Sequence, residues 1–251
     1  MTAKDTSWGG VADWYDTLLA EDDTYQAQVI LPNLMRIVSP KQGEQIIDIA
    51  CGQGFFARAI KESGATVVGA DLSKELITIA SKESRGISFH VAASDKLAFA
   101  KDHSFDTAII ILAIQNIEKM DETFKEAARV LKPNGRLVLV LNHPTFRVLK
   151  HSSWEYDEKA GIQYRRVDRY LSGEKVCIDM HPGKQEKTKT VSYHRSLQDI
   201  SKSLRKNGFA ITRLEEWISH KTSGKGPRQR AEDAARKEIP LFMALEVEKI
   251  K

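Results

Sequence analysis

The sequence predicts an α/β fold in which a mostly parallel sheet is covered by helices on both faces. Between residues 45 and 142, short apolar runs alternate with segments whose apolar residues have helical spacing. Strands that are apolar along their whole length, without polar alternation, are typical of parallel sheets buried on both faces. With 251 residues, the chain is long enough for one sizeable core with an inserted segment.

Composition narrows the class of protein. The chain is 41% hydrophobic and 29% charged with a formal net charge of +4, which gives nucleic acid little support as a partner. Its two cysteines, Cys51 and Cys177, form no C-x-x-C pair, so we expect no metal site and a reducing compartment. The first residues contain no apolar signal region, and no run reaches the roughly 18 apolar residues of a membrane helix. We therefore expect a cytoplasmic protein with no membrane partner.

Residues 1–44 are expected to form two helical pieces. V-A-D-W-Y-D-T-L-L is the first, and the second has apolar side chains at helical spacing from Val29 to Val38. Ser39-Pro40 and Gly43 then break the chain.

The alternating region begins with a strand over Gln45–Ile49 and a helix over Gln53–Ser63. Four further strands are expected over 66–70, 87–92, 105–112 and 136–141. Ser73 is placed to cap one intervening helix, and apolar spacing from Phe124 to Leu131 predicts another. The turn Lys132–Gly135 is expected to end that helix.

The pattern stops after Asn142. Residues 143–195 are polar, aromatic and charged, and we interpret them as an inserted cap. Short runs with strand-like alternation occur at 163–171, 175–180 and 188–194, which favours antiparallel strands. The α/β pattern resumes over 196–251, where Ser196 and Asp199 resemble a capping box at the start of a helix. The last two strands are expected over 209–217 and 241–250.

The run I-I-D-I-A-C-G-Q-G-F-F-A, from Ile46 to Ala57, carries the clearest functional signal. A strand ends at an acid, and Gly52 and Gly54 then allow a sharp turn and a close backbone approach to a ligand. Asp71 ends the next strand, where a carboxylate can accept hydrogen bonds from ribose hydroxyls. Because open α/β sheets bind ligands at the carboxyl ends of their strands, the run predicts a pocket for a nucleoside-bearing cofactor.

Two cofactors are compatible with this arrangement. NAD-dependent dehydrogenases carry G-x-G-x-x-G beneath a pyrophosphate, and here the string is G-Q-G-F-F-A, with Ala57 in the third place. Asp48 at the strand end would repel a pyrophosphate, whereas it suits a ligand with a cationic end. S-adenosylmethionine has an α-ammonium group and a sulfonium, so it is favoured and a dehydrogenase is the weaker alternative.

The string D-x-x-C-G-x-G resembles the first motif of class I S-adenosylmethionine-dependent methyltransferases that act on small molecules. The resemblance covers 45–142 strongly and 196–250 more loosely. It implies a Rossmann-like fold with seven strands in the order 3-2-1-4-5-7-6, strand 7 antiparallel, and a helical lid formed by residues 1–44. The donor would be S-adenosyl-L-methionine and the product S-adenosyl-L-homocysteine.

The resemblance also implies a set of cofactor contacts. They follow the first four strands, and one comes from the lid. The expected residues are Tyr15, Asp48, Ala50, Gly52, Gln53, Gly54, Asp71, Leu72, Ser94, Asp95, Leu112 and Gln115. In this scheme Asp48 lies at the methionine end, Asp71 at the ribose and Leu72 against the adenine.

Methyl transfer requires alignment of the acceptor and exclusion of water, and a general base only where the acceptor atom keeps its proton. His143, after the fifth strand, is the best base candidate, and Tyr15 is a second catalytic candidate. The residues expected to contact substrate are Gln115, Asn116, His143, Tyr164, Arg166 and Tyr170. Alternatively, His143 is a structural histidine in a turn, and Tyr164, Arg166 and Tyr170 lie on a strand face that is exposed to solvent.

The predicted function is therefore methylation of oxygen, nitrogen or carbon of a small molecule. One alternative is an RNA methyltransferase that uses the basic segment 219–237, although its acids and E-D-A-A-R-K pattern favour a loop followed by a solvated helix. Another is a cofactor-binding protein without catalysis. The acceptor, its reacting atom and the oligomeric state stay open at this point.

Overall fold

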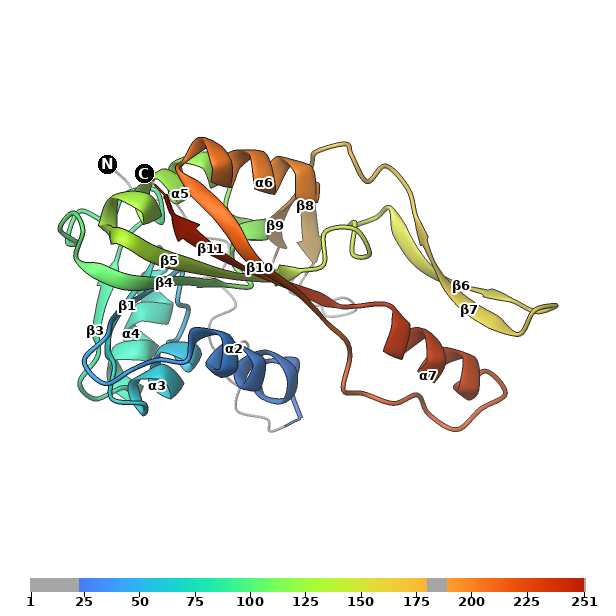
Figure 1. Cartoon of the computed structure of the whole chain (residues 1–251). Helices are drawn as coiled ribbons and strands as arrows, with labels where there is room; N and C mark the ends of the chain where they lie inside the picture. Colours follow the sequence, from blue (N-terminus) through green and yellow to red (C-terminus); the bar gives the residue numbers. More distant parts are fainter. Residues whose placement is uncertain (1–22, 180–188, 251) are drawn as a thin grey trace.

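The computed structural model describes residues 23–179 and 189–250, and its centre is a seven-stranded sheet (Figure 1). The strands are β1 (Gln45–Ile49), β2 (Thr66–Asp71), β3 (Ser88–Val91), β4 (Phe105–Ile111), β5 (Leu131–Asn142), β10 (Phe209–Trp217) and β11 (Phe242–Lys249). Their order is β3-β2-β1-β4-β5-β11-β10. Strand β11 is antiparallel to both neighbours, whereas the pairs from β3 to β5 are parallel. The predicted fold class and strand order are confirmed.

Helices cover both faces of this sheet (Figure 1). Against one face lie α2 (Leu31–Val38), which follows the π-helical turn η2 (Gln26–Ile30), and α3 (Phe55–Lys61). Against the other lie α5 (Met120–Val130) and α6 (Leu197–Lys206). Helix α4 (Lys74–Glu83) packs beside β2 and β3. No helix in the described ranges is long and apolar enough to cross a membrane.

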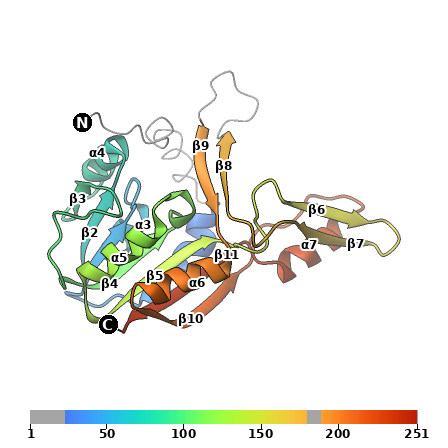
Figure 2. The ribbon, with the colours of Figure 1, turned by 90° about the horizontal axis from the view of Figure 1, so that it is seen from above.

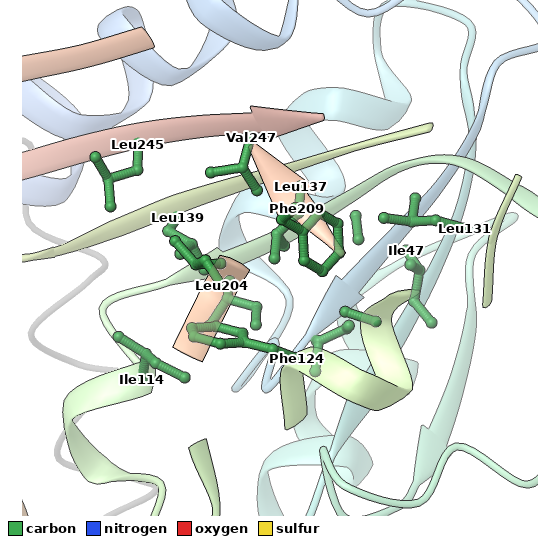
Figure 3. Packing of buried hydrophobic residues seen from close by; sticks show 14 of the residues in the cluster. Ile47, Ile114, Phe124, Leu131, Leu137, Leu139, Leu204, Phe209, Leu245 and Val247 are labelled. Atoms are coloured by element: carbon green, nitrogen blue, oxygen red, sulfur yellow. The ribbon is translucent and has the colours of Figure 1, made fainter. Parts of the chain in front are cut away.

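The larger of two apolar clusters lies between the sheet and helices α5 and α6 (Figure 3). Phe124 of α5, Leu204 of α6 and Phe209 of β10 are each at most 1% exposed and meet strand residues such as Ile47 and Leu139. Burial of such side chains stabilises the fold by roughly 1.5–3 kcal/mol each. This packing holds the carboxyl ends of β1 and β4 at one edge, where the site lies.

Two local predictions about helix ends have different outcomes. Ser196 forms the predicted capping box with Asp199, because each side chain accepts the other residue's backbone N–H. By contrast, α5 already ends at Val130, before the turn Lys132–Gly135 that was expected to end it. That turn instead lies inside β5, where pairing with β4 is interrupted and resumes at Arg136.

Two antiparallel hairpins occupy the inserted segment. The first joins β6 (Ser152–Asp157) to β7 (Ile162–Val167), and the second joins β8 (Glu174–Asp179) to β9 (Lys189–His194). Figure 2 shows β6 and β7 beside α7 (Gln229–Glu238), at a distance from the centre of the sheet. The antiparallel prediction is confirmed. Strand β6 was not predicted, because its serines and acids are weak strand formers.

Candidate cofactor site

The turn after β1 has an uncommon backbone conformation. Ala50, Gly52 and Gly54 have φ angles of 60°, 57° and 81°. A Cβ atom on Gly54 would lie 2.8 Å from the ring of Phe89 in β3, so packing as well as backbone requires glycine there. Gly52 has open space around it, so only its backbone angle favours glycine. The role of Gly54 is thus to let α3 begin against β3, a reason that the sequence did not reveal.

Two carboxylates lie at the ends of β1 and β2. Asp71 accepts the backbone N–H of Gly52 at 2.9 Å through Oδ2 and that of Ser73 at 2.8 Å through Oδ1. Asp48 is 1% exposed, and its Oδ2 is buried without a hydrogen-bond partner in the described structure. Burial raises the pKa of Asp48 well above its usual value, and the charge of Asp71 raises it further. Burial also raises the pKa of Asp71, against the effect of its backbone hydrogen bonds.

A cavity of about 470 Å³ opens between the carboxyl ends of β1, β2 and β4. It brings together most of the residues predicted to bind cofactor and one predicted to contact substrate. These are Asp48, Ala50, Gly52, Gln53, Asp71, Leu72, Ser94, Asp95, Leu112 and Asn116. Among the described residues predicted to bind cofactor, two do not line it: Gly54 is absent from its wall, and Gln115 lines a smaller neighbouring cavity.

The cavity wall fits S-adenosylmethionine on three counts. The unpartnered oxygen of Asp48 calls for a cation or a hydrogen-bond donor, and no cationic side chain of residues 23–179 or 189–250 contributes to the pKa of either Asp48 or Asp71. Gln53 Oε1 is likewise buried without a partner in the described structure. Leu72 lines the cavity yet is 47% exposed, so it offers an apolar surface that a nucleobase can cover.

The backbone is strained where two strands meet the cavity. Ala50 follows β1 with a φ of 60°, and Leu112 follows β4 with a φ of 52°. Each such non-glycine residue costs of order 1 kcal/mol, and this kind of strain is concentrated at ligand sites. Both residues line the cavity, so the strain shapes the cavity wall.

Strand β9 supplies cavity residues that the sequence analysis missed. Val191 and Tyr193 alternate with the buried Thr190, Ser192 and His194, and both line the cavity. The alternation in T-V-S-Y-H was visible in the sequence. Their position beside the cofactor residues was not, because it depends on the contact of β9 with η3 (Ile114–Asn116) after β4.

His143 lines neither cavity. Its side chain is buried, with Nε2 2.7 Å from Glu216 Oε1 and Nδ1 accepting the Thr145 N–H at 3.3 Å. Since Nδ1 accepts, the proton lies on Nε2 and is donated to Glu216. Burial lowers the pKa of His143, with Glu216 acting in the opposite direction. This geometry describes a structural pair between β5 and β10 and does not favour a general base.

The predicted substrate contacts from the insertion lie outside both cavities. Tyr164 is 46% exposed on β7, and the Arg166 guanidinium pairs with Asp168 at 2.5 Å. The Tyr170 hydroxyl accepts the Leu197 N–H at 2.9 Å, which connects the insertion to α6. These three side chains are therefore either exposed or in structural contacts, and none of them lines the cofactor cavity.

The predicted lid is described only from residue 23. Helix α2 packs Leu34, Ile37 and Val38 against the sheet, and no residue of 23–44 lines either cavity. This part therefore covers the sheet and not the site. Tyr15 lies outside the described residues.

Comparison with known proteins agrees with this geometry. Residues 47–139 match the family model of a methyltransferase domain. A crystal structure of an S-adenosylmethionine-dependent methyltransferase from Mesorhizobium loti superposes with a TM-score of 0.69 at 26% identity, covering 90% of this chain and 99% of that one. The α/β core of the chain is therefore similar to class I S-adenosylmethionine-dependent methyltransferases. These similarities support S-adenosylmethionine as the cofactor.

Curated relatives match this chain over part of their length. Demethylmenaquinone methyltransferase of Tropheryma whipplei (strain Twist) is 35% identical over 106 residues, which are 41% of this chain and 44% of that protein. Ubiquinone/menaquinone biosynthesis C-methyltransferase UbiE of Haemophilus ducreyi is 29% identical over 179 residues, 64% of this chain and 67% of that protein. The chain thus spans less than half the length of the first of these relatives.

The protein should bind S-adenosylhomocysteine more weakly when Asp71 loses its charge. We expect Asp71→Asn to cost about 1–3 kcal/mol of binding free energy, because a charge-assisted acceptor becomes a neutral amide. Isothermal calorimetry measures the loss. Glu75→Gln, an exchange of the same kind at an exposed position of α4, serves as the control and should leave the affinity unchanged. Equal affinities for both variants would contradict the role of Asp71.

Asp48 should destabilise the ligand-free protein as the pH rises. The unfolded carboxyl loses its proton near its usual pKa of about 3.9, whereas the folded one keeps it to higher pH. Above pH 4 the unfolded state therefore binds fewer protons, and stability falls until the folded carboxyl also ionises. Asp48→Asn should remove this loss, so its advantage in urea unfolding should be larger at pH 8 than at pH 4. A stability difference independent of pH would refute this.

His143→Ala separates the structural role of the histidine from a catalytic one. Loss of the buried ring and of its bond to Glu216 should lower the free energy of unfolding by about 1–3 kcal/mol. Affinity for S-adenosylhomocysteine should stay unchanged, as His143 does not line the cavity. If unfolding is unaffected while turnover collapses, His143 is the general base after all.

Proposed function

We propose that this chain transfers the methyl group of S-adenosylmethionine to oxygen, nitrogen or carbon of a small-molecule acceptor. The observation that carries the proposal is the buried, unpartnered oxygen of Asp48 beside Asp71, in a cavity at the carboxyl ends of the strands. The two curated relatives are named for methylation in quinone biosynthesis, which is chemistry on small molecules. These relatives match only part of the chain, so the proposal names no particular acceptor.

The proposed mechanism relies on position more than on acid–base chemistry. Bound S-adenosylmethionine supplies an electrophilic methyl group on a sulfonium centre. Asp48 stabilises positive charge at the methionine end, and Asp71 and Leu72 hold the nucleoside. Val191 and Tyr193 of β9 cover the cavity and limit the access of water. Alignment of this kind contributes several kcal/mol to the rate of a displacement reaction.

The acceptor enters, in this proposal, beside η3, between the cofactor cavity and the end of β5. Asn116 lines the cofactor cavity, and the adjacent Gln115 lines the smaller neighbouring cavity. The described residues of the cofactor cavity include no histidine. An acceptor whose nucleophile is already deprotonated at neutral pH, or whose carbon is electron-rich, suits such a site.

In this proposal only one hairpin of the inserted segment lines the cofactor cavity, whereas Ser152 and Arg165 of the other hairpin line the smaller cavity. Strand β9 contributes to both cavities, so β8–β9 is the part that we expect to cap the site. The β6–β7 hairpin packs against α7, where Arg228 pairs with Glu158 at 2.5 Å and lies over the Tyr156 ring at 4.4 Å. The part of 143–195 that matters for the acceptor is therefore smaller than the whole insertion.

RNA methylation is the less favoured alternative. It requires a basic face beside the cofactor cavity, whereas no residue of 219–237 lines either cavity. Figure 2 shows α7 together with β6 and β7, away from the strand ends that form the site. A small acceptor also fits a cytoplasmic setting, in line with the unpaired thiols of Cys51 and Cys177.

A two-step experiment tests the proposed function. Calorimetry should show that S-adenosylhomocysteine binds and that NAD does not, because the acids of the cavity oppose a pyrophosphate. A screen of small phenols, amines, carboxylic acids and enols should then release S-adenosylhomocysteine with at least one acceptor. Binding of the nucleoside with no turnover across the screen would favour the cofactor-binding protein without catalysis. Preferential binding of NAD would overturn the proposal.

A further inference from the structure

A second cavity of about 170 Å³ lies next to the cofactor cavity. Its wall includes η3 after β4, the end of β5, the following loop and strand β9, and Tyr193 lines both cavities. It therefore opens at the carboxyl edge of the sheet, where α/β proteins bind their ligands. None of the residues assigned above to the cofactor lines it, apart from the predicted Gln115.

The charges on this second cavity are all of one sign. Arg147, Lys150, Arg165 and Arg195 line it, and its described lining contains no aspartate or glutamate. The cofactor cavity has the opposite balance, with Asp48 and three further acids on its wall against one cation, Lys119, which pairs with Asp95. Two neighbouring cavities thus differ in the charge of the ligand that each can accept.

Two of these arginines are held in place by the protein. Arg195 donates to the carbonyl oxygens of Ile114 at 3.1 Å and Ile117 at 2.7 Å. Arg165 donates through Nε to the Phe146 carbonyl at 2.8 Å and through Nη2 to Ser152 Oγ at 2.7 Å. Arg195 is thereby largely committed to the loop after β4, whereas Nη1 of Arg165 keeps donor capacity for a ligand.

Arg147 is different, because its guanidinium makes no hydrogen bond or ion pair with any described residue. The side chain is exposed, yet nearby protein lowers its pKa through burial, with Tyr25 acting in the opposite direction. Burial lowers the pKa of Arg165 as well, and the nearby charge of Arg147 lowers it further. Two guanidinium groups thus face one small cavity without a carboxylate between them, and an anion there would relieve their repulsion.

The rest of the wall suits the body of an organic acid. Apolar side chains of Ile114, Met120, Leu141, Val148 and Ile200 line the cavity. Gln115 also lines it, and its Oε1 is buried without a hydrogen-bond partner in the described structure. That oxygen requires a donor, such as a ligand hydroxyl or amine.

We propose that this second cavity binds an anionic oxygen group, a carboxylate or a phosphate, of the methyl acceptor, and that Arg147 recognises it with Arg165 in support. That the ligand is the methyl acceptor rests on the proposed function. That it is an anion rests on the cavity alone. Guanidinium groups bind carboxylate and phosphate through paired hydrogen bonds, which a lysine cannot match. The acceptor is then an acid whose apolar part lies against Leu141 and Ile200.

Benzoate and benzamide provide a matched pair of probes, because they share size and shape and differ in charge. Binding of each is measured by ligand-observed NMR and calorimetry to the full chain saturated with S-adenosylhomocysteine. Benzoate should bind at least about tenfold more tightly than benzamide, as a charge-assisted hydrogen bond is stronger than a neutral one. Arg147→Gln should abolish the difference, and Arg147→Lys should restore it in part.

Arg166→Gln is the control, since Arg166 is the next residue of β7, is exposed, and pairs with Asp168 outside the cavity. It should leave the preference for benzoate intact. Thermal melts of each variant verify folding, and competition by inorganic phosphate in a parallel titration separates phosphate recognition from carboxylate recognition. Equal binding of benzoate and benzamide without phosphate competition, or a preference that survives Arg147→Gln, overturns the proposal.

The same titration repeated without S-adenosylhomocysteine separates this inference from the proposed function. If benzoate binds through Arg147 but S-adenosylhomocysteine does not bind, the anion site stands and the methyltransferase proposal fails. If S-adenosylhomocysteine binds and neither benzoate nor phosphate does, the cofactor site stands and the anion site is refuted.

Discussion

The carboxylate of Asp71 connects the two turns on which the cofactor site depends. It accepts the Gly52 N–H from the turn after β1 and the Ser73 N–H at the start of α4, so one side chain fixes both strand ends. Asp48 is buried beside it without a partner in the described structure, which is an energetic cost in the ligand-free protein. A cationic ligand removes that cost. The cavity is therefore prepared for a cation before any ligand arrives.

The neighbouring cavity has the opposite charge and is suited in the same way to a ligand of opposite sign. An acidic wall meets the cationic methyl donor, and a basic wall meets the acceptor that we propose to be anionic. Tyr193 lies on the boundary of the two, on a strand that comes from the insertion. The insertion thus contributes Val191 and Tyr193 of β9 to the cofactor cavity, and it contributes Arg147 and other residues of the loop after β5 to the basic cavity. In the β6–β7 hairpin, Arg165 reaches the basic cavity, whereas Tyr164 and Arg166 next to it do not.

The sheet and the cofactor half of the site were predictable because their causes are local. An apolar strand, an acid, a Gly-x-Gly turn and a second acid are close together along the chain, and parallel strands place their carboxyl ends at one edge. Asp48, Asp71 and Leu72 therefore appear where the sequence indicated. The position of His143 relative to the cavities was not predictable from its local sequence. The histidine follows a strand at the correct edge, but its partner Glu216 belongs to β10, far away in the sequence.

By itself, the sequence determined the α/β class, the strand positions and the two acids, Asp48 and Asp71, that line the larger cavity, because hydrophobic period and turn chemistry act over a few residues. Only the tertiary structure decided which side of each strand end faces a cavity. It brought β9 against η3, paired His143 with Glu216, and left Arg147 without a partner among the described residues beside Arg165. These outcomes depend on contacts between segments that lie far apart in the chain, and no local pattern records them.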